Sequence, residues 1–249
     1  MSPLDLLPPD VGGAAFAVML MVSFTGSFIT IAFGIGGGGL VLAVLASLLP
    51  PAALIPVHGA VQFGSNVTRA GLLLGQVSWR TVPGFAVGAV VGAALGGVVV
   101  VDLPPGLVQA GVGAFLIWTI VARPPAWLTR WPWLAGGVST FLTMFFGATG
   151  LFVAGFTRSL GLPRHGYVAT HATLMTLQHG LKIAMFGLLG FAFGTWAALA
   201  LALIAAGFAG TLCGRLVLNR ITDTAFRRVL DVILVLISLR LIWAGLVAG

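Results

Sequence analysis

Long apolar stretches without charge follow one another along almost the whole chain, and they limit the fold more than any other feature of the sequence. Charged residues make up 7% of the 249 residues, and the mean hydropathy is +1.13. Soluble domains carry roughly 25% charged residues. Since a segment that crosses lipid must satisfy its backbone hydrogen bonds internally, the sequence predicts an all-α polytopic membrane protein.

The net charge of +7 does not indicate nucleic-acid binding. Most of the 12 basic residues lie in loops between apolar runs, a distribution that is typical of positive-inside topology. The N-terminal stretch MSPLDLLPPD has no basic residue, so we expect a retained first helix and no cleavable signal peptide. Cys213 lies in an apolar segment and is expected to pack there, because a single cysteine provides no disulfide framework.

Runs of about 20 apolar residues, the length that crosses a bilayer, predict six helices, of which the first and the fourth also carry polar residues. These helices cover residues 53–74, 82–101, 106–121, 166–188, 195–213 and 225–247. Two further segments, 12–49 and 131–160, are too long for one crossing and too short for two. Glycines interrupt both segments near the middle, at Gly34–Gly39 and at Gly147–Gly150.

The two halves of the chain resemble each other. A shift of 113 positions superposes FITIAFGIGG (28–37) on FLTMFFGATG (141–150), with five identities. The same shift pairs Pro50 with Pro163, His58 with His171, Ser65 with Gln178, Asn66 with His179, and Arg69 with Lys182. Polar positions in register over some forty residues favour an internal duplication, with repeats at 1–122 and 131–249 and a linker at 123–130.

Loop charges predict that the repeats are inverted. Arg80 follows the first polar helix, whereas the equivalent loop of the second half, 189–194, is uncharged. The next loop carries Asp102 in the first half, and its equivalent carries Arg215, Arg220, Arg227 and Arg228. Equivalent loops with opposite charge lie on opposite sides of the membrane, and this requires an odd number of membrane crossings in each half. We therefore expect each repeat to be a re-entrant helix hairpin plus three transmembrane helices, with the linker cytoplasmic and both termini periplasmic; additional full crossings are the alternative.

The glycine breaks and the polar helices after them predict an anion site. Non-helical backbone at membrane depth is tolerated where it lines a watery cavity, and free N–H groups at a helix start attract anions. His58, Gln62, Ser65, Asn66 and Arg69 share one helical face, and no carboxylate interrupts it. The predicted substrate-binding residues are Gly36, Gly37, Gly38, His58, Gln62, Asn66, Arg69, Thr149, Gly150, His171, Gln178, His179 and Lys182.

Structural roles compete with this interpretation. The glycine ladder on the helix at 82–101 favours close helix packing, and the glycine breaks could serve the same purpose. His58 and His171 could simply hydrogen-bond between helices. Arg69 and Lys182 lie near the ends of their helices, where long basic side chains extend to the membrane surface.

Three stretches of the sequence together resemble the TauE/SafE family of sulfite and organosulfonate exporters. They are GIGGGGLVLAVLASLLPP, then VHGAVQFGSNVTRAG, and the second copy FFGATGLFVAGFTRSLGLPRHGYVATHATLMTLQHGLKIAMFGLLG. The resemblance covers nearly the whole chain, although Thr149 stands opposite Gly36 in the second copy. It implies export of small sulfur-containing anions, such as sulfite, sulfoacetate or related sulfonates, across a bacterial inner membrane.

We therefore expect a transporter that holds its anion between two inverted repeats and works by alternating access. The membrane potential drives an anion outward by about 2.3 kcal/mol per charge per 100 mV, so no coupling ion is required. If protons are coupled, the histidines are better carriers than Asp231.

Other function classes receive less support from the sequence. Transport of another small anion, such as a carboxylate, and divalent-metal transport through the histidines are the alternatives. Catalysis is not expected, because HExxH, CxxC and paired intramembrane aspartates are missing from the sequence. We expect no cofactor and no metal site; the expected partners are the small anion and the lipid bilayer, and assembly into a homo-oligomer stays open.

Overall fold

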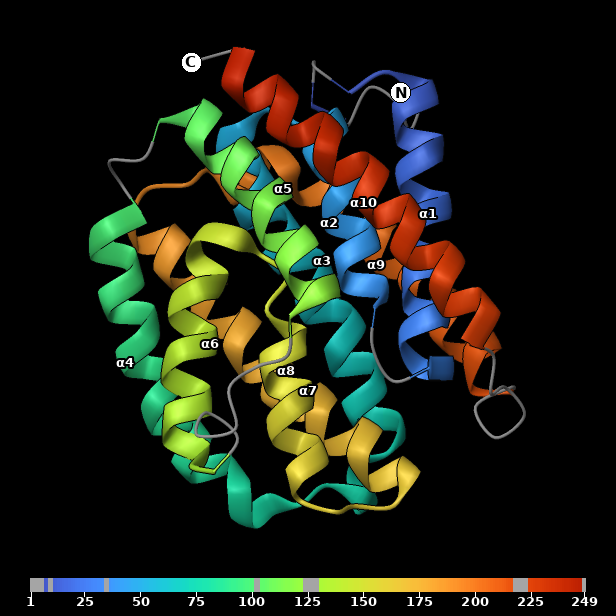
Figure 1. The fold of residues 1–249 in the computed structure, drawn as a ribbon, viewed down its shortest axis with the longest axis vertical. Coiled ribbons are helices and arrows are strands. Elements are labelled where there is room, and N and C mark those ends of the chain that lie inside the picture. Colours follow the sequence, from blue (N-terminus) through green and yellow to red (C-terminus); the bar gives the residue numbers. More distant parts are fainter. Residues whose placement is uncertain are drawn as a thin grey trace.

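The computed structural model describes residues 7–8, 11–33, 36–100, 104–122, 130–216 and 224–247, without the side chains of 105 and 224–230. This part of the chain is helical and contains no strand (Figure 1), which confirms the all-α prediction. The α-helices are α1 (Gly13–Phe33), α2 (Gly37–Leu48), α3 (Pro51–Leu72), α4 (Val82–Val100), α5 (Pro105–Val121), α6 (Pro132–Phe146), α7 (Gly150–Ser159), α8 (Arg164–Leu188), α9 (Phe193–Arg215) and α10 (Thr224–Val247). Two short 3₁₀ helices, η2 (Leu74–Gln76) and η3 (Trp79–Thr81), lie between α3 and α4.

The helices predicted outside the two broken segments begin and end within two residues of the observed bounds of α3, α4, α5, α8, α9 and α10. Proline opens several helices of the fold: Pro51 begins α3 and Pro132 begins α6. Proline is favoured at this position because the first helical N–H has no intrahelical partner and the ring fixes φ near the helical value.

Each glycine-broken segment forms two helices. The first segment forms α1 and α2, and the second forms α6 and α7. The chain turns between them at Gly36, with φ of 111°, and at Gly147, with φ of 75°. L-residues with a side chain rarely adopt these values, so glycine is required at both breaks.

The arms of the two broken segments differ in length. By length and composition, Gly13–Phe33, Trp79–Val100 and Phe193–Arg215 are each sufficient to cross a bilayer. α1 has 21 residues, whereas α6, its counterpart in the second half, has 15. At 1.5 Å per residue these lengths are about 31 and 22 Å. The first segment therefore has one arm of spanning length, and its re-entrant character stays a prediction.

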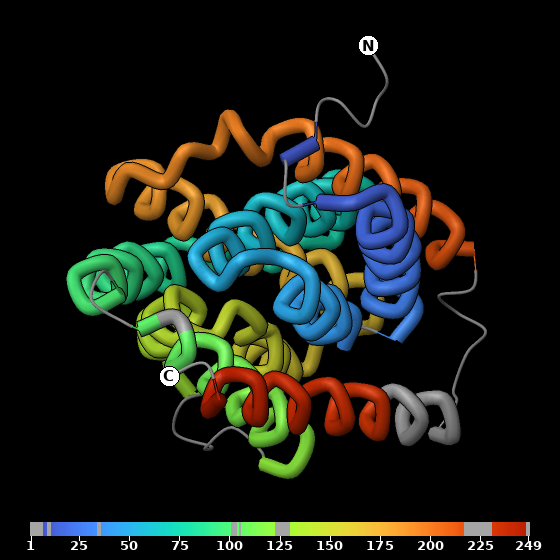
Figure 2. Tube along the Cα trace, turned by 90° about the horizontal axis from the view of Figure 1, so that it is seen from above, coloured from blue at the N-terminus to red at the C-terminus, as the bar shows by residue number. Residues whose placement is uncertain are grey.

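Helices from the two halves pack against each other throughout the molecule. α3 and α8 contact each other in the interior, α1 packs on α9, α4 packs on α6, and α5 lies along α10 (Figure 2). Glycines permit the closest contacts. A Cβ atom at Gly88 of α4 would collide with the backbone of Trp133 on α6, and one at Gly210 of α9 would collide with Phe24 on α1. The glycine ladder of α4 thus serves close packing, as one interpretation of the sequence expected.

The pair formed by α5 and α10 is closely packed from one end to the middle. A Cβ atom at Gly245 would lie 2.5 Å from the carbonyl oxygen of Gly106, and one at Gly113 would lie 2.6 Å from that of Ser238. The first contact joins the beginning of α5 to the end of α10, and the second lies near the middle of both helices. In Figure 1 the two helices run side by side over the front of the bundle, and α2 packs against both.

A long-range hydrogen bond ties α1 to the second half. The Nη2 atom of Arg164, at the start of α8, donates to the carbonyl oxygen of Ala32 over 2.6 Å. Ala32 lies in the last turn of α1, where helical carbonyl groups have no intrahelical partner. Arg164 therefore caps α1 next to the first glycine break.

Several predicted features fall outside the described residues. They are Gly34 in the first break, Asp102, residues 123–129 of the linker, Arg220, and the side chains of Arg227 and Arg228.

Candidate functional site

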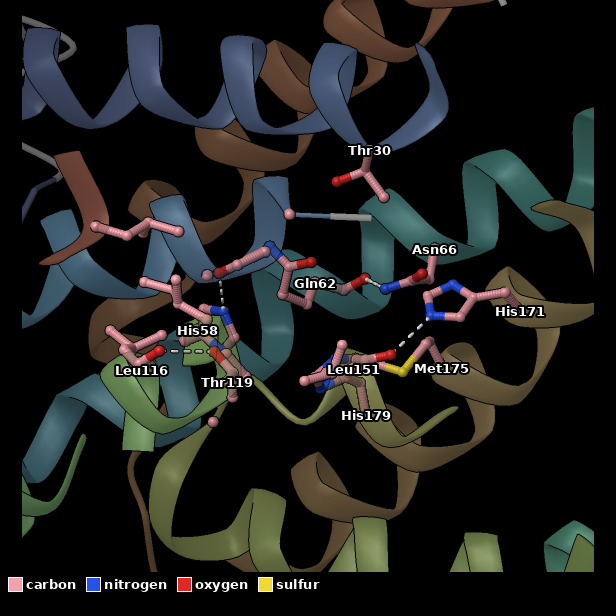
Figure 3. A pocket seen from close by; sticks show the side chains of 18 of the residues that line it. Thr30, His58, Gln62, Asn66, Leu116, Thr119, Leu151, His171, Met175 and His179 are labelled. Carbon is pink, nitrogen blue, oxygen red and sulfur yellow. Dashed lines mark hydrogen bonds between the residues drawn. The ribbon is translucent and has the colours of Figure 1, made fainter. Parts of the chain in front are cut away.

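A cavity of about 250 Å³ lies where the two glycine breaks meet α3 and α8 (Figure 3). Of the thirteen substrate-binding residues predicted from the sequence, nine line it. These nine are Gly36, Gly38, His58, Gln62, Asn66, Arg69, Gly150, His171 and His179. They come from both halves of the chain, so the fold gathers two separate sequence motifs around one space.

Both helices that follow a break begin at the cavity wall. Gly38 and Gly39 of α2 line it from the first half, and Gly150 and Leu151 of α7 line it from the second. The first N–H groups of an α-helix have no intrahelical acceptor and carry the positive end of the helix dipole. The cavity therefore receives two sets of free backbone donors, from helices of 12 and 10 residues.

Two histidines are held in the same way in the two halves. The Nε2 atom of His58 lies 3.1 Å from the carbonyl oxygen of Gly38, and that of His171 lies 3.2 Å from the carbonyl oxygen of Gly150. Because a carbonyl oxygen only accepts, each Nε2–H donates. These are the inter-helix hydrogen bonds that the structural interpretation expected, and they also fix both rings at the cavity.

His179 of α8 comes close to His58 of α3. Their ring centroids are 6.0 Å apart, with the rings nearly perpendicular. The Nδ1 atoms of both rings are buried without a hydrogen-bond partner among the described residues. Within that same part of the chain, no group of three or more His, Cys, Asp or Glu side chains is arranged to hold a metal ion.

Arg69 supplies a buried cation to the cavity. Its side chain is 2% exposed, so it does not extend to the surface. Its guanidinium donates to Ser65 Oγ over 3.0 Å and to Asn66 Oδ1 over 2.8 Å. Both acceptors are neutral, and Arg69 Nε has no hydrogen-bond partner in the described part of the chain. A buried charge with neutral partners alone is costly, and an anion beside it would relieve that cost.

The remaining four predicted residues lie outside the lining: Gly37, Thr149, Gln178 and Lys182. Gly37 packs α2 against α1, because a Cβ atom there would collide with the backbone of Gly26. Gln178 donates to the hydroxyl of Thr149 and accepts from Ser139 Oγ over 3.2 Å.

Lys182 is fully buried behind the cavity. Its Nζ atom donates to Thr143 Oγ1 at 3.4 Å, and its Cε atom would lie 2.6 Å from a Cβ atom at Gly59. Gln178 and Lys182 therefore join helices within the second half and across to α3.

The cavity also contains residues that sequence reasoning missed. Apolar side chains line it from α5, α7, α8 and α10, namely Leu116, Ile120, Leu151, Met175 and Leu234. Thr30 could have been found, since it aligns with Thr143 in the repeat. The apolar residues gave no signal, because α5 and α10 are apolar around most of their circumference.

Asp231 of α10 differs from the expectation of a lining without carboxylates. It lines the cavity at the side of α5 and α10, and its side chain is exposed. Sequence reasoning considered the polar faces of the helices at 53–74 and 166–188 and left the helix at 225–247 as a plain span. Among the described lining residues, the buried charge is that of Arg69 and the exposed charge is that of Asp231.

A comparison with known protein families matches residues 18–241 to the family described as sulfite exporter TauE/SafE. Neither the curated proteins nor the solved structures give a match to this chain.

Proposed function

The chain belongs to the TauE/SafE family, and from this membership we propose that it exports a small sulfur-containing anion, such as sulfite, sulfoacetate or a related sulfonate. The family and the apolar helices make it a multi-pass membrane protein of a transporter family. The proposal extends this to the chemical class of the substrate, to its binding site and to the mechanism.

The observation that carries the proposal is the position of Arg69. Its guanidinium lies at a cavity that also receives the starts of α2 and α7 and the side chains of His171 and Asn66. A cation and N–H groups that line one cavity suit the oxygen atoms of a sulfonate or sulfite, because charge-assisted hydrogen bonds are stronger than neutral ones. The bound anion would neutralise a charge that is otherwise buried against neutral groups.

Alternating access fits the arrangement of α5 and α10. Thr119 and Ile120 of α5 and Asp231 and Leu234 of α10 line the cavity. The opposite ends of the same two helices are held together by the contacts of Gly245. The binding space thus adjoins one end of this helix pair, while the other end is closed. In the proposed cycle the glycine end opens and the cavity end closes.

An inverted duplication is consistent with the pattern of helix contacts. If the halves are equivalent, α1 matches α6, α3 matches α8, and α4 matches α9. The contact of α1 with α9 then has its counterpart in the contact of α6 with α4, and the contact of α3 with α8 joins two matching helices. In Figure 1 the start of α1 and the end of α10 lie at the top, whereas the turn from α7 to α8 lies at the bottom. That turn joins Arg158 to Arg164. We place this basic end in the cytoplasm of a bacterium and the termini in the periplasm.

A binding screen on the purified protein tests this proposal. We would measure thermal stability with sulfite, sulfoacetate, taurine, sulfate, acetate and divalent metal ions. An anion at 100 times its dissociation constant stabilises the folded state by about 2.7 kcal/mol. Sulfite or a sulfonate should stabilise the wild type and the control Arg80→Gln, which changes an exposed arginine. The same anion should lose most of its effect on Arg69→Gln.

The other outcomes are distinct. Stabilisation by acetate without any by sulfur oxyanions would make the protein a carboxylate transporter. Stabilisation by divalent metals alone would favour the alternative in which the histidines bind a metal. An anion effect that is equal in Arg69→Gln and wild type would place the anion somewhere other than this cavity.

A further inference from the structure

The cavity has two chemically different sides. Arg69, Gln62 and Asn66 of α3 bring polar groups, together with the glycine backbone at the start of α2. Five apolar side chains make up what we call the apolar wall: Leu116, Ile120, Leu151, Met175 and Leu234. In the view of Figure 3, Leu116, Leu151 and Met175 lie on the opposite side of the cavity from Thr30, with His58 and His179 beside them.

Side chains of the apolar wall belong to the hydrophobic core of the protein. Leu116 is 2% exposed, and Leu234 belongs with it to the same core cluster. Thr119 lies between Leu116 and Ile120 on α5. Its hydroxyl group donates a hydrogen bond to the carbonyl oxygen of Leu116 over 2.7 Å. The apolar wall therefore presents hydrocarbon to the cavity. Covering such a surface with another hydrocarbon group is favourable, because it removes apolar area from water.

The cavity is larger than an inorganic oxyanion needs. At about 30 Å³ for each water-sized group, the four heavy atoms of sulfite take up roughly half of it. The apolar wall is part of the lining of this larger space. A polar head held at Arg69 would leave room there for a short chain of carbon atoms.

We propose that the apolar wall is a subsite for a short saturated tail, so that the preferred substrate is an organic oxyanion with a hydrocarbon chain, as in an alkanesulfonate. This inference rests on the proposed function and deepens it. The head group would be held by Arg69 and the helix starts, and the tail would lie against Leu116, Ile120 and Leu234.

The charges near the wall also disfavour a second anionic group on the tail. Among the described lining residues, α5 and α10 contribute no cation, and α10 contributes the carboxylate of Asp231. A tail that ends in a carboxylate would meet apolar side chains and find no cation from these two helices to pair with. A plain hydrocarbon tail meets neither obstacle and displaces water from the apolar wall.

A chain-length series tests the subsite. Dissociation constants would be measured on the detergent-purified protein for sulfite, methanesulfonate, ethanesulfonate, propanesulfonate, butanesulfonate and sulfoacetate. Affinity should rise about fourfold with each added methylene up to the length that fills the cavity, the ratio that corresponds to about 0.8 kcal/mol for burying one CH₂ group. Propanesulfonate should bind more tightly than sulfoacetate.

A matched pair of substitutions on α10 locates the effect. Leu234→Ala removes side-chain atoms from the apolar wall, whereas Leu236→Ala makes the same change at an exposed position that does not line the cavity. Leu234→Ala should weaken butanesulfonate severalfold and leave methanesulfonate nearly unchanged. Leu236→Ala should leave the whole series as in the wild type. Ile120→Ala on α5 repeats the test if Leu234→Ala does not fold.

The possible results separate this inference from the proposed function. Anion binding that is independent of chain length, or tighter for sulfoacetate than for propanesulfonate, overturns the tail subsite and keeps the anion site. The same holds if Leu234→Ala, or Ile120→Ala in its place, weakens all sulfonates equally. No binding by any sulfur oxyanion overturns the proposed function, and the subsite with it.

Discussion

Arg69 and Lys182 occupy equivalent positions in the two halves, yet their surroundings differ. Arg69 lies at the cavity, whereas Lys182 is buried behind it against Gly59 and Thr143. His58 and His171, by contrast, make matching bonds to the carbonyl groups after the two breaks. The two halves are thus alike in the histidine bonds next to the glycine breaks. They differ in whether the basic side chain lines the cavity. A transporter built from equivalent halves needs such a difference in any state that is open on one side only.

The largest expected effect tests the two cations against each other. Arg69→Gln should weaken binding of a sulfur oxyanion by about 2–5 kcal/mol, because it removes the buried charge that faces the anion. Lys182→Gln should change the dissociation constant by less than a few-fold, since Lys182 does not line the cavity. Calorimetric titration of both variants measures the contrast. Equal losses in the two variants would show that both cations bind the anion in one conformation.

The two ends of the pair formed by α5 and α10 give the second test. Gly245→Leu forces a large side chain into a contact where even a Cβ atom would lie 2.5 Å from a carbonyl oxygen. Such overpacking costs about 1–3 kcal/mol, so the closed end should open more readily. Anion flux into proteoliposomes should change about tenfold or more while binding persists.

The control for this variant is Gly194→Leu on α9, where nothing lies within 4 Å of the added Cβ atom. Its flux should equal that of the wild type. Flux through Gly245→Leu that also matches the wild type would mean that the glycine end is a static contact rather than part of the transport cycle.

The third test concerns the breaks. Gly147→Ala places a side chain at φ of 75°, and its Cβ atom would lie 2.8 Å from Leu42 Cδ1. This sparsely populated backbone conformation alone costs a residue with a side chain about 1–3 kcal/mol. The variant should therefore lose several degrees of thermal stability.

Gly161→Ala separates backbone strain from crowding, because Gly161 has φ of 63° and open space around it. It should lose less stability than Gly147→Ala in the same melting experiment. If Gly161→Ala loses as much thermal stability as Gly147→Ala, or more, the contact with Leu42 does not contribute to the effect at Gly147.

The smallest effects concern the matching histidines. His58→Gln and His171→Gln should each weaken anion binding by about 0.5–1.5 kcal/mol, the net contribution of one hydrogen bond. If each histidine orients only the break of its own half, the two losses should add in the double variant. A double variant that loses much more or much less than the sum would show that the two breaks are coupled through the anion.

Much of the fold followed from the sequence because the signals were local. Apolar runs gave the helices, and the glycines at positions 36 and 147 marked the turns that only glycine adopts easily. His58 and Arg69 could be proposed together because they share one helical face. These inferences need only the period of a helix and the length of a span.

The rest of the site depends on packing between distant helices. In α5 and α10, apolar residues occur on every side, so nothing in the sequence distinguishes Leu116 or Leu234 from a lipid-facing leucine. Lys182 was proposed by its equivalence to Arg69, but its side chain lies behind the cavity, against Gly59 and Thr143. Gly37 was proposed for its backbone and is instead required for the contact of α2 with α1.

The hydrogen bond from Arg164 to Ala32 has a consequence for how the protein is made. The two residues are 132 positions apart, so α1 leaves the ribosome long before the side chain that caps it. The main neighbour of α1 in the other half, α9, is synthesised later still. During insertion α1 can pack against α2, which follows it directly, but the surface that contacts α9 in the folded protein must first face other neighbours, such as lipid. Its final place is fixed only when nearly the whole chain has been translated.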